Sequence, residues 1–305
     1  GVRQHFFVDY WNIGIAKAHI SRFLDDEKPE VHWFPIKSKR KFHADPFALP
    51  DAEDPDKINV FFETFEYKNR KGIIDYTCYE GKYSAAVTVI AEPEHLSYPY
   101  LLFENEEIIL IPECFESGAV YRYTPEKFPL KWKSRQVILD GFPGVDNTVI
   151  KRDGLYWLFT SDKRDAVQFN LHLFYSESLL GHWAPHPKNP VKTDIRSARS
   201  AGTPFEYKNE LYRPGMDYSE KVEGGIVINK VVILSKTEFE EIPVKKIEPY
   251  SDAYFSDKIH TLCTAGNYTV IDGAREAFIF INWTFLRYKF ALLRNKLQSI
   301  LKKGS

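Results

Sequence analysis

One pattern recurs along the chain at intervals of about 50 residues, which is the size of a four-stranded propeller blade. Each copy begins with a polar or small residue, continues with an apolar pair and a turn, and ends in an aromatic-rich strand. Some turns have hairpin chemistry, as at Asp153-Gly154 and Gly266-Asn267. The first positions of the copies are separated by 53, 48, 57 and 57 residues and are Asp45, Tyr98, Asp146, Thr203 and His260.

Five such units predict an all-β chain folded as a five-bladed β-propeller. The alternative is an all-β sandwich or a pair of stacked barrels. Strands of a sandwich need not repeat at a fixed interval, whereas the blades of a propeller do. The regular interval therefore favours the propeller.

The pattern changes at the C-terminal end of the chain. Residues 275–303 contain no Gly or Pro, and apolar residues such as Phe278, Ile281 and Phe285 recur at helical spacing. Lys and Arg make the polar side of this predicted helix basic. It either packs on the propeller or on a second copy, or it lies in a membrane surface. We expect two parts, a five-bladed propeller over 1–274 and an amphipathic basic α-helix over 275–303.

Composition excludes several classes of protein. The 305 residues include 41 Lys and Arg against 42 Asp and Glu, and this balance argues against a nucleic-acid binder. No apolar run reaches the roughly 18 residues of a membrane span. Cys78, Cys114 and Cys263 are odd in number and widely spaced, which favours a reducing compartment. Aromatic residues make up 15% of the chain, and most of them are expected to fill the interfaces between blades.

Motifs for common cofactors are missing from the sequence. It has no Walker loop, no GxGxxG after a strand, no GxSxG and no HExxH. The nine His show no spacing typical of metal ligands. We therefore expect neither a cofactor nor a metal.

The start of each inner strand is where a propeller gathers side chains around its central channel. The five first positions of the repeat are therefore candidates for one shared site. Carboxylates also end several strands, and buried carboxylates are costly unless they are partnered. They are either caps and turn residues or members of the site, and they are Glu63, Glu113, Asp162 and Asp217.

Paired carboxylates with aromatic side chains suit sugar chemistry, in which one carboxyl acts as base and another as acid. Tyr98 is the candidate aromatic residue among the first positions. Arg196 and Arg199, three apart among small residues, suit a clamp for a phosphate or carboxylate. The alternative is that both arginines are solvated loop residues.

Specific stretches resemble known families. His43-Ala44-Asp45-Pro46-Phe47, followed by Phe61-Phe62-Glu63, resembles the opening blade of family 43 glycoside hydrolases and their furanosidase relatives. Over about residues 10–245 the chain also resembles the propeller domain that is N-terminal in plant glucosamine inositolphosphorylceramide transferases and occurs in bacterial surface-polysaccharide gene clusters. The stretches that carry this second resemblance include His95-Leu96-Ser97-Tyr98-Pro99-Tyr100, Ile111-Pro112-Glu113, Tyr156-Trp157-Leu158-Phe159-Thr160-Ser161-Asp162 and Leu211-Tyr212-Arg213-Pro214-Gly215-Met216-Asp217.

The resemblance implies roles for three carboxylates. Asp45 matches the general base of the hydrolases, and Asp146 is similar to their auxiliary Asp. The Glu-Gly-Pro context of the hydrolases' acid is not found here. Glu113 is proposed as the acid by its place in the chain.

Together these features lead us to expect a glycosyltransferase of cell-surface polysaccharide or glycolipid synthesis. Asp45 or Glu113 would deprotonate the acceptor hydroxyl, and Arg196 and Arg199 would hold the phosphate of an activated donor, with a furanosyl sugar as one candidate. The alternatives are a family 43-like glycoside hydrolase and a non-catalytic glycan-binding propeller of a larger transferase. The further residues expected to bind substrate are Glu63, Tyr98, Asp162, Thr203, Asp217 and His260.

The expected partners are an activated sugar donor and a glycan acceptor, with no nucleic acid. The expected location is the cytoplasm, with peripheral contact to the inner membrane through the C-terminal helix. We also expect a further domain beyond this chain.

Overall fold

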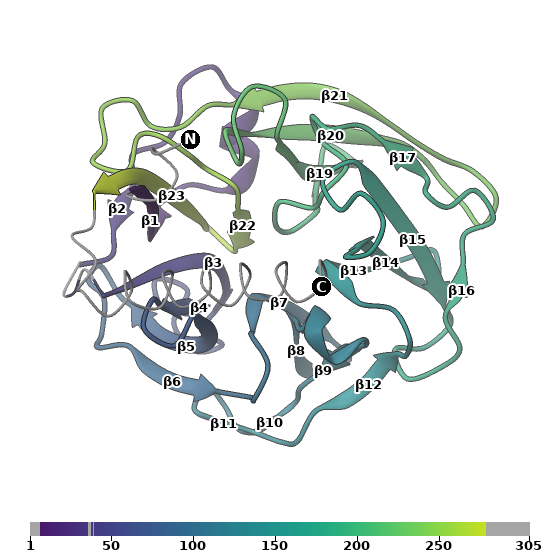
Figure 1. Cartoon of the computed structure of the whole chain (residues 1–305), viewed down its shortest axis with the longest axis horizontal. Coiled ribbons are helices and arrows are strands. Elements are labelled where there is room, and N and C mark those ends of the chain that lie inside the picture. The colour runs from purple at the N-terminus through teal and green to yellow at the C-terminus, as the bar shows by residue number, and fades with distance from the viewer. Residues whose placement is uncertain (1–6, 36–37, 39, 279–305) are drawn as a thin grey trace, which may run out of the picture. The chain divides into compact units, whose positions relative to one another are not determined.

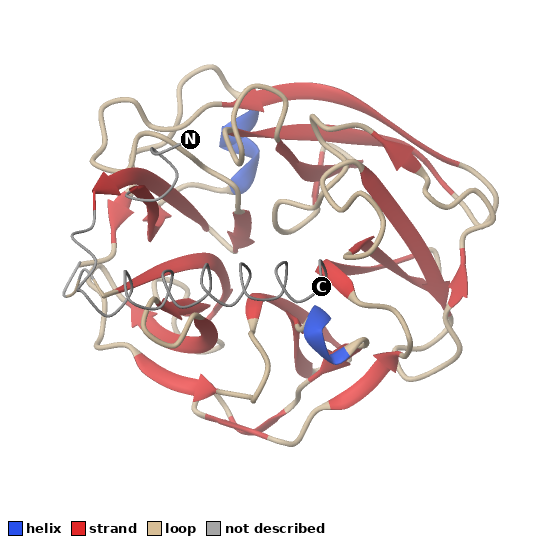
Figure 2. Cartoon of the chain, in the orientation of Figure 1, coloured by secondary structure: helices blue, strands red, loops and turns tan. Residues whose placement is uncertain are grey.

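The computed structural model describes residues 7–278 apart from 36, 37 and 39, and its regular secondary structure consists almost wholly of strands joined by loops (Figure 2). Its two short 3-10 helices are Ile20–Leu24 (η2) and Phe115–Ser117 (η3). Contacts group Trp11–Arg275 into one compact unit, and residues 1–10 with 276–305 into a second. All residues of the candidate site lie in the first unit.

Four sheets of at least four strands surround a common centre in the described part of the chain (Figure 1). The first contains Lys41–Pro50 (β3), Ile58–Glu66 (β4), Lys71–Tyr79 (β5) and Val87–Ile90 (β6). Another contains Gly144–Arg152 (β13), Leu155–Asp162 (β14), Asn170–Ser176 (β15), Ala184–Pro185 (β16) and Lys192–Thr193 (β17). The next contains Phe205–Tyr207 (β18), Glu210–Asp217 (β19), Gly225–Leu234 (β20) and Phe239–Ile247 (β21).

The last of these sheets closes the ring because it combines strands from both ends of the fold. It joins two early strands, Phe7–Ala16 (β1) and His32–Trp33 (β2), to two late ones, Leu262–Ala265 (β22) and Tyr268–Phe278 (β23), in the order β2-β1-β23-β22. Neighbours in a ring of sheets then meet without leaving a long open edge.

The all-β, propeller-like arrangement is confirmed, but the prediction of five complete blades is wrong. The second repeat occupies its own sector (Figure 1) without forming one continuous sheet, and a single bridge from Leu110 to Tyr123 links its inner pair to the rest. Proline at 112, 125 and 129 removes ladder donors, and η3 interrupts the strands shortly after Glu113. Its pieces are Ser97–Glu104 (β7) with Glu107–Glu113 (β8), Val120–Arg122 (β9) with Gln136–Leu139 (β12), and Pro125–Lys127 (β10) with Lys131–Trp132 (β11).

The predicted C-terminal helix begins too early. Arg275 to Phe278 belong to strand β23, which lies between β1 and β22 in the closing sheet. Residues 279–303, the rest of the predicted helix, lie outside the described residues. Within the described part of the chain, no helix is long and apolar enough to cross a bilayer.

Aromatic side chains fill the space between neighbouring sheets, as expected from the composition. Phe61 on β4 contacts the ring of Trp132 in the second repeat at 5.5 Å between centroids, edge to face. Phe47 on β3 contacts Tyr98 at 4.7 Å in the same way. Such contacts add to the burial of large apolar areas, so the central strands are hydrophobic on both faces.

The repeated first position is a β-bulge. Registers shift between residues 44 and 47 in β3, 97 and 100 in β7, and 145 and 148 in β13. At each bulge one residue has a left-handed backbone, and these are Asp45 with φ 50°, Tyr98 with φ 45° and Asp146 with φ 51°. A bulge bends its strand and re-aims a side chain. The bulges therefore direct these residues towards the axis.

The fourth repeat places Gly202 at this position, one residue before the predicted Thr203. Gly202 has φ 122°, and a Cβ there would lie 2.0 Å from the carbonyl oxygen of Leu262. Around it, the N–H of Leu262 donates to Ala201 O at 2.8 Å and the N–H of Thr203 donates to Leu262 O at 3.1 Å. Only glycine permits this approach of the fourth and fifth repeats.

Substitution of Gly202 is predicted to weaken closure of the ring. Gly81→Ala is the matched control, since Gly81 has φ 66° with nothing within 4 Å, and it should cost about 1 kcal/mol from backbone strain alone. Gly202→Ala adds a clash with backbone and should cost roughly 1–3 kcal/mol more. Urea unfolding of both variants measures the difference, and equal losses would contradict the close approach.

Candidate functional site

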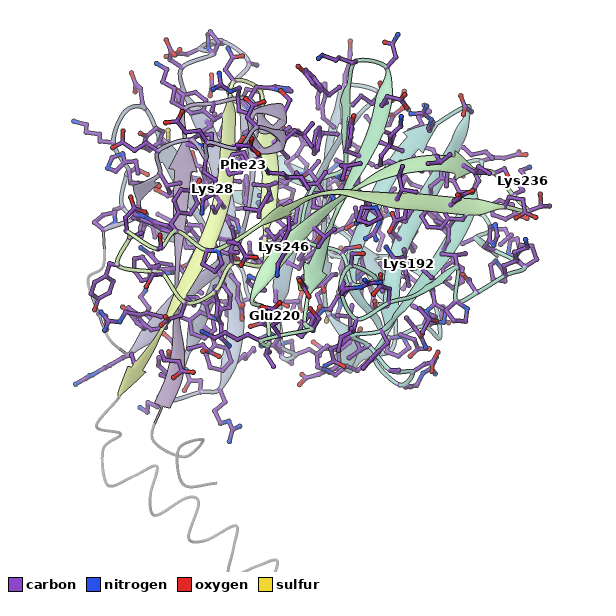
Figure 3. The ribbon with its side chains drawn as sticks, turned by 90° about the horizontal axis from the view of Figure 1, so that it is seen from above. Phe23, Lys28, Lys192, Glu220, Lys236 and Lys246 are labelled. Carbon is purple, nitrogen blue, oxygen red and sulfur yellow. The ribbon has the colours of Figure 1, made fainter. Side chains whose placement is uncertain are left out.

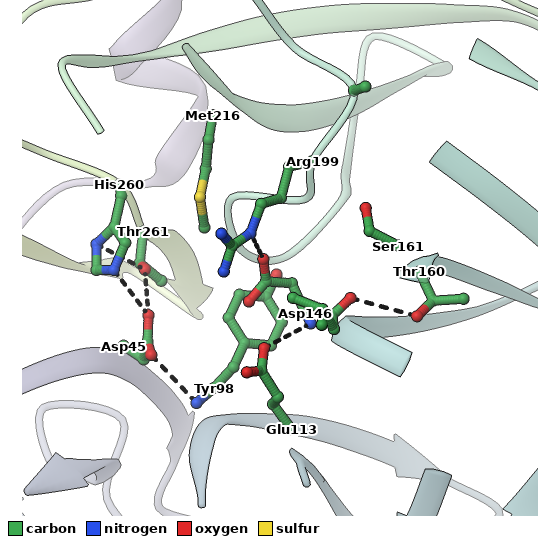
Figure 4. Close-up of polar contacts among 12 residues, drawn as sticks. Asp45, Tyr98, Glu113, Asp146, Thr160, Ser161, Arg199, Met216, His260 and Thr261 are labelled. Atoms are coloured by element: carbon green, nitrogen blue, oxygen red, sulfur yellow. Dashed lines mark hydrogen bonds and ion pairs between the residues drawn. The ribbon is translucent and has the colours of Figure 1, made fainter. Parts of the chain in front are cut away.

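A cavity of about 290 Å³ opens among the inner strands. Its polar lining comes from elements far apart in the sequence, and Figure 4 shows several of these side chains facing one another. Its aromatic lining is Trp11, Phe42, Phe65 and Phe115. Its charged or titratable lining is Asp45, Glu63, His95, Glu113, Asp146, Lys163, Arg199, Glu223 and His260.

Asp45 is held by groups from two other segments of the chain. The hydroxyl of Thr261 donates to its Oδ1 at 3.0 Å, and the N–H of Tyr98 donates to its Oδ2 at 3.2 Å. His260 Nε2 lies 3.3 Å from Oδ1. Burial raises the pKa of Asp45 to about 6, although the charge of His260 opposes the rise.

His260 is fixed by a buried carboxylate, Asp272, which is not exposed at all. The ring Nδ1 lies 2.6 Å from Asp272 Oδ2, and the N–H groups of His260 and Thr261 donate to Oδ1 at 3.0 and 2.9 Å. Trp11 covers the ring at 4.0 Å between centroids. Burial alone would lower the pKa of His260, but Asp272 and Asp45 together raise it to about 10.

Glu113, Asp146 and Arg199 form a second group across the cavity (Figure 4). The N–H of Asp146 donates to Glu113 Oε2 at 3.1 Å, and Arg199 Nε donates to Asp146 Oδ2. Arg199 also donates to the hydroxyl of Tyr218 at 2.9 Å. Burial, followed by the charge of Asp146, raises the pKa of Glu113 to about 8, against the opposing charge of Arg199. Glu113 is therefore protonated at neutral pH.

A buried ion pair positions the segment that carries Arg199. Arg213 donates to the carbonyl oxygens of Ser197 at 2.6 Å and Ala198 at 3.3 Å, directly before Arg199. Glu241 accepts from Arg213 Nε at 2.8 Å and from Lys192 at 2.7 Å. All donors of this cluster thus have acceptors, as a buried ion pair requires. The Arg199 side chain is held by its backbone as well as by Asp146.

Glu63 and His95 line the wall next to the first repeat. Glu63 Oε1 lies 3.5 Å from His95 Nε2, and the N–H of Gly72 donates to His95 Nδ1 at 2.9 Å. Burial raises the pKa of Glu63 well above its usual range, and the charges of Asp45 and Glu113 add to the rise. Burial lowers the pKa of His95.

Six of the predicted site residues line the cavity: Asp45, Glu63, Glu113, Asp146, Arg199 and His260. Tyr98 lies beneath it and is fully buried. Its hydroxyl contacts Thr148 Oγ1 at 3.0 Å and accepts from the N–H of Gly202 at 2.8 Å. Tyr98 therefore supports the floor of the site from below.

The other predicted residues lie outside the lining, each with its own partner. Asp162 accepts from Arg164 at 3.0 and 2.8 Å, and the exposed Arg196 donates to Asp194 at 3.0 Å. Asp217 accepts from the hydroxyl of Ser219 at 2.6 Å and lies 3.3 Å from Lys246, a surface residue labelled in Figure 3. Thr203 joins the contact with Leu262. The predicted double-arginine clamp is thus reduced to Arg199.

Several residues of the site were missed by sequence reasoning. Trp11, Lys163 and Glu223 line the cavity from segments that do not follow the repeat. His95 stands three residues before Tyr98, in a stretch that carries the family resemblance, and these two features were its signals in the sequence. Asp272 follows an apolar run in the last strand, as the other strand-end carboxylates do, and that pattern could have found it.

Asp45, His260 and Asp272 are the one set of buried groups in the described residues that could hold a metal ion, with ligand atoms within 4.8 Å of one another. Both ring nitrogens of His260 face carboxylate oxygens. A ring protonated at both nitrogens has no lone pair for a metal. This chemistry fits a buried ion network better than a metal centre.

The pKa of His260 predicts how stability depends on pH. The folded protein keeps His260 protonated to about pH 10, whereas a free histidine loses its proton near 6.5. The stabilisation is complete below the unfolded value and is lost as pH rises through the folded one. The free energy of unfolding should fall by several kcal/mol between these values, and less in His260→Gln. The exposed His182→Gln is the control, and an equal slope in all three proteins would contradict the network.

Comparisons with known proteins agree with the fold and add a family. A family model described as the N-terminal domain of glucosamine inositolphosphorylceramide transferase 1 matches residues 35–254. The glucosamine inositolphosphorylceramide transferase 1 of Arabidopsis thaliana is 36% identical over 211 residues, which are 67% of this chain and 27% of that protein. Its counterpart in Oryza sativa subsp. japonica is 34% identical over the same share of this chain and 28% of its own length. The chain thus spans little more than a quarter of these relatives.

Solved structures resemble the chain in fold. A family 117 glycoside hydrolase of Zobellia galactanivorans has a TM-score of 0.55 at 13% identity, covering 87% of this chain and 90% of that one. The catalytic domain of a GH62 α-L-arabinofuranosidase of Coprinopsis cinerea has a TM-score of 0.56 at 14% identity, covering 77% and 82%. At these identities the likeness concerns the fold alone.

Proposed function

We propose that this chain, which belongs to the family of the N-terminal domain of glucosamine inositolphosphorylceramide transferase 1, is a sugar-transferring domain. Its central cavity binds a sugar, and the residues around the cavity transfer that sugar in polysaccharide or glycolipid synthesis. The observation that carries the proposal is the meeting of Asp45, Glu63, Glu113 and Asp146 with aromatic side chains around one cavity. Carboxyl pairs and aromatic rings are the groups that sugar chemistry uses. The volume, about 290 Å³, is near the lower end of small-molecule sites.

The environments of two carboxyl groups separate their roles. The pKa of Asp45 is about 6 and that of Glu113 is about 8. At neutral pH the first is mostly ionised and the second mostly protonated. Two carboxyl groups whose pKa values are pushed apart in this way serve as base and acid. Asp45 is therefore the base of the proposed reaction, and Glu113 is its acid.

In the proposed step the acceptor hydroxyl gives its proton to Asp45 as its oxygen forms a bond to the anomeric carbon of the donor. The bond from that carbon to the leaving oxygen breaks, and the leaving oxygen takes up negative charge or the proton of Glu113. Asp146 keeps the guanidinium of Arg199 directed at the cavity. Electrostatic stabilisation of the leaving group is the contribution expected of such a fixed cation.

Arg199 and Lys163 are the two long cationic side chains among the described lining residues. In the proposed function they bind the phosphate of the activated donor. Lys163 Nζ lies 4.1 Å from the ring of Phe115. Arg196 takes no part, since it is exposed and bound to Asp194. Donors with furanosyl sugars are the first to test, followed by pyranosyl donors.

Substitution of the two carboxyl groups tests the proposal. Asp45→Asn and Glu113→Gln should each lower sugar transfer by roughly 10²–10⁴-fold, the usual contribution of an acid or base. Transfer by the wild type should rise as pH passes about 6 and fall as it passes about 8. Asp162→Asn, at a strand end outside the lining, is the control. Transfer is measured from activated sugar donors to glycan acceptors, with thermal unfolding to verify folding.

An Asp45→Asn variant that folds and transfers as fast as the wild type would remove Asp45 as the base. A second candidate function is hydrolysis, favoured by the same difference in pKa between the carboxyl groups of Asp45 and Glu113. In that reaction water replaces the acceptor, and aryl furanosides release sugar without an activated donor. Glycan binding that survives both substitutions, with no turnover of any donor, would instead identify a binding domain of a larger transferase.

We also propose an acceptor and a cellular location for the domain. Its acceptor is a glycan or glycolipid, and its place is the cytoplasmic side of a membrane, reached by the basic C-terminal segment. Fractionation of cells that express the full-length protein tests this location.

A further inference from the structure

Glu63 and His95 line the cavity without a part in the proposed transfer step. Both side chains are largely buried, with 7% and 21% of their surface exposed. Among the described residues, no Lys, Arg or His nitrogen other than His95 Nε2 lies within ion-pair distance of the Glu63 carboxyl, and the charge of His260 acts on it from further away. A buried acid and a buried imidazole at the wall of a sugar site call for a ligand group that satisfies both.

The tautomer of His95 follows from its neighbours. Gly72 donates its N–H to Nδ1, so Nδ1 must offer a lone pair. The ring is neutral because burial lowers its pKa. Its single proton is therefore on Nε2, the nitrogen that faces Glu63. His95 presents a donor to the cavity, and Glu63 Oε1 presents an acceptor beside it.

Packing around Gly72 fixes this arrangement. A Cβ at Gly72 would lie 2.3 Å from Leu96 O, 2.5 Å from Glu63 Oε1 and 2.8 Å from His95 Cε1. The N–H of Leu96 also donates to Gly72 O at 3.1 Å. The backbone of β5 thus lies against both side chains, and neither can move towards it.

We propose that Glu63 and His95 together bind one hydroxyl group of the sugar, which donates to Glu63 Oε1 and accepts from His95 Nε2–H. Their separation of 3.5 Å is too long for a good direct hydrogen bond and leaves both groups available to a shared partner. A hydroxyl is the sugar substituent that donates and accepts through one atom. An ammonium group only donates, and a deoxy carbon does neither. The inference rests on the proposed function for the presence of a sugar, and it is independent of the transfer chemistry.

Loss of this hydroxyl should weaken binding strongly. A deoxy sugar would leave two buried polar groups without partners, and each such group costs roughly 1–3 kcal/mol. We expect at least a roughly 10-fold loss of affinity for one monodeoxy sugar and smaller losses for the others. Sites that hydrogen-bond a hydroxyl reject analogues without it in this way.

The test uses methyl glycosides of arabinofuranose, xylopyranose, glucopyranose and galactopyranose, with binding measured by titration calorimetry. Monodeoxy forms of the tightest binder are then measured against the wild type, Glu63→Leu, His95→Phe, Glu63→Gln and Asp162→Asn. The one large deoxy penalty should shrink by roughly 5-fold or more in Glu63→Leu and in His95→Phe, because each variant lacks one of the two groups that the missing hydroxyl would leave unpaired. It should persist in Glu63→Gln, whose amide oxygen still accepts, and in the control Asp162→Asn.

Two results would overturn the inference while leaving the proposed function intact. One is a glycoside that binds with no large deoxy penalty, and the other is a penalty that Glu63→Leu and His95→Phe leave unchanged. If no glycoside binds, the proposed function fails first. Nitrogen-15 spectra of the wild type give a readout that needs no variant. They should show the proton of His95 on Nε2, and a proton on Nδ1 would contradict the proposed geometry.

Discussion

Around the axis, the backbone N–H of each bulged inner strand donates to an acid from the repeat before it. Asp45 N donates to Asp272 at 3.1 Å, Tyr98 N to Asp45 at 3.2 Å, and Asp146 N to Glu113 at 3.1 Å. The left-handed backbone at each bulge makes these N–H groups point inward. The ring of sheets is therefore joined at its centre by carboxyl groups, two of which, Asp45 and Glu113, also line the cavity.

This sharing explains the electrostatics of the site. Carboxyl groups that bind backbone N–H must stay buried, and burial raises the pKa values of Asp45 and Glu113. Burial also raises the pKa of Glu63, and the charges of Asp45 and Glu113 add to that rise. One buried histidine and one arginine, His260 and Arg199, balance the carboxylates that remain ionised. Acid and base character at neutral pH is thus a consequence of how the propeller closes. A single change at Asp45 affects both closure and chemistry.

The repeat in the sequence predicted the fold and the centre of the site because it reflects the bulges. Asp45, Tyr98 and Asp146 share a backbone conformation, so they recur at matching places in the sequence. In the fourth repeat the predicted residue, Thr203, was one residue too late. The residue at the equivalent place is Gly202, because the close approach to Leu262 requires glycine. The fifth repeat departs further, since a histidine and its buried partner replace the bulge.

Strand-end carboxylates could not be separated by sequence alone. Glu63 and Glu113 face the cavity, whereas Asp162 is bound by Arg164 two residues later. Such local partners decide which carboxyl is available, and a repeat pattern does not show them. Residues from irregular segments, such as His95, were missed for the same reason. The fragmented second blade, with its prolines, also escaped the simple count of repeats.

The central claim is that a sugar binds among these carboxyl groups at the axis. A crystal structure of the protein soaked with a phosphosugar measures this directly. The account predicts a sugar ring within hydrogen-bond distance of Asp45 and Glu113, with its phosphate towards Arg199 and Lys163. A sugar bound only at the outer surface of the sheets, with the cavity filled by water, would contradict it.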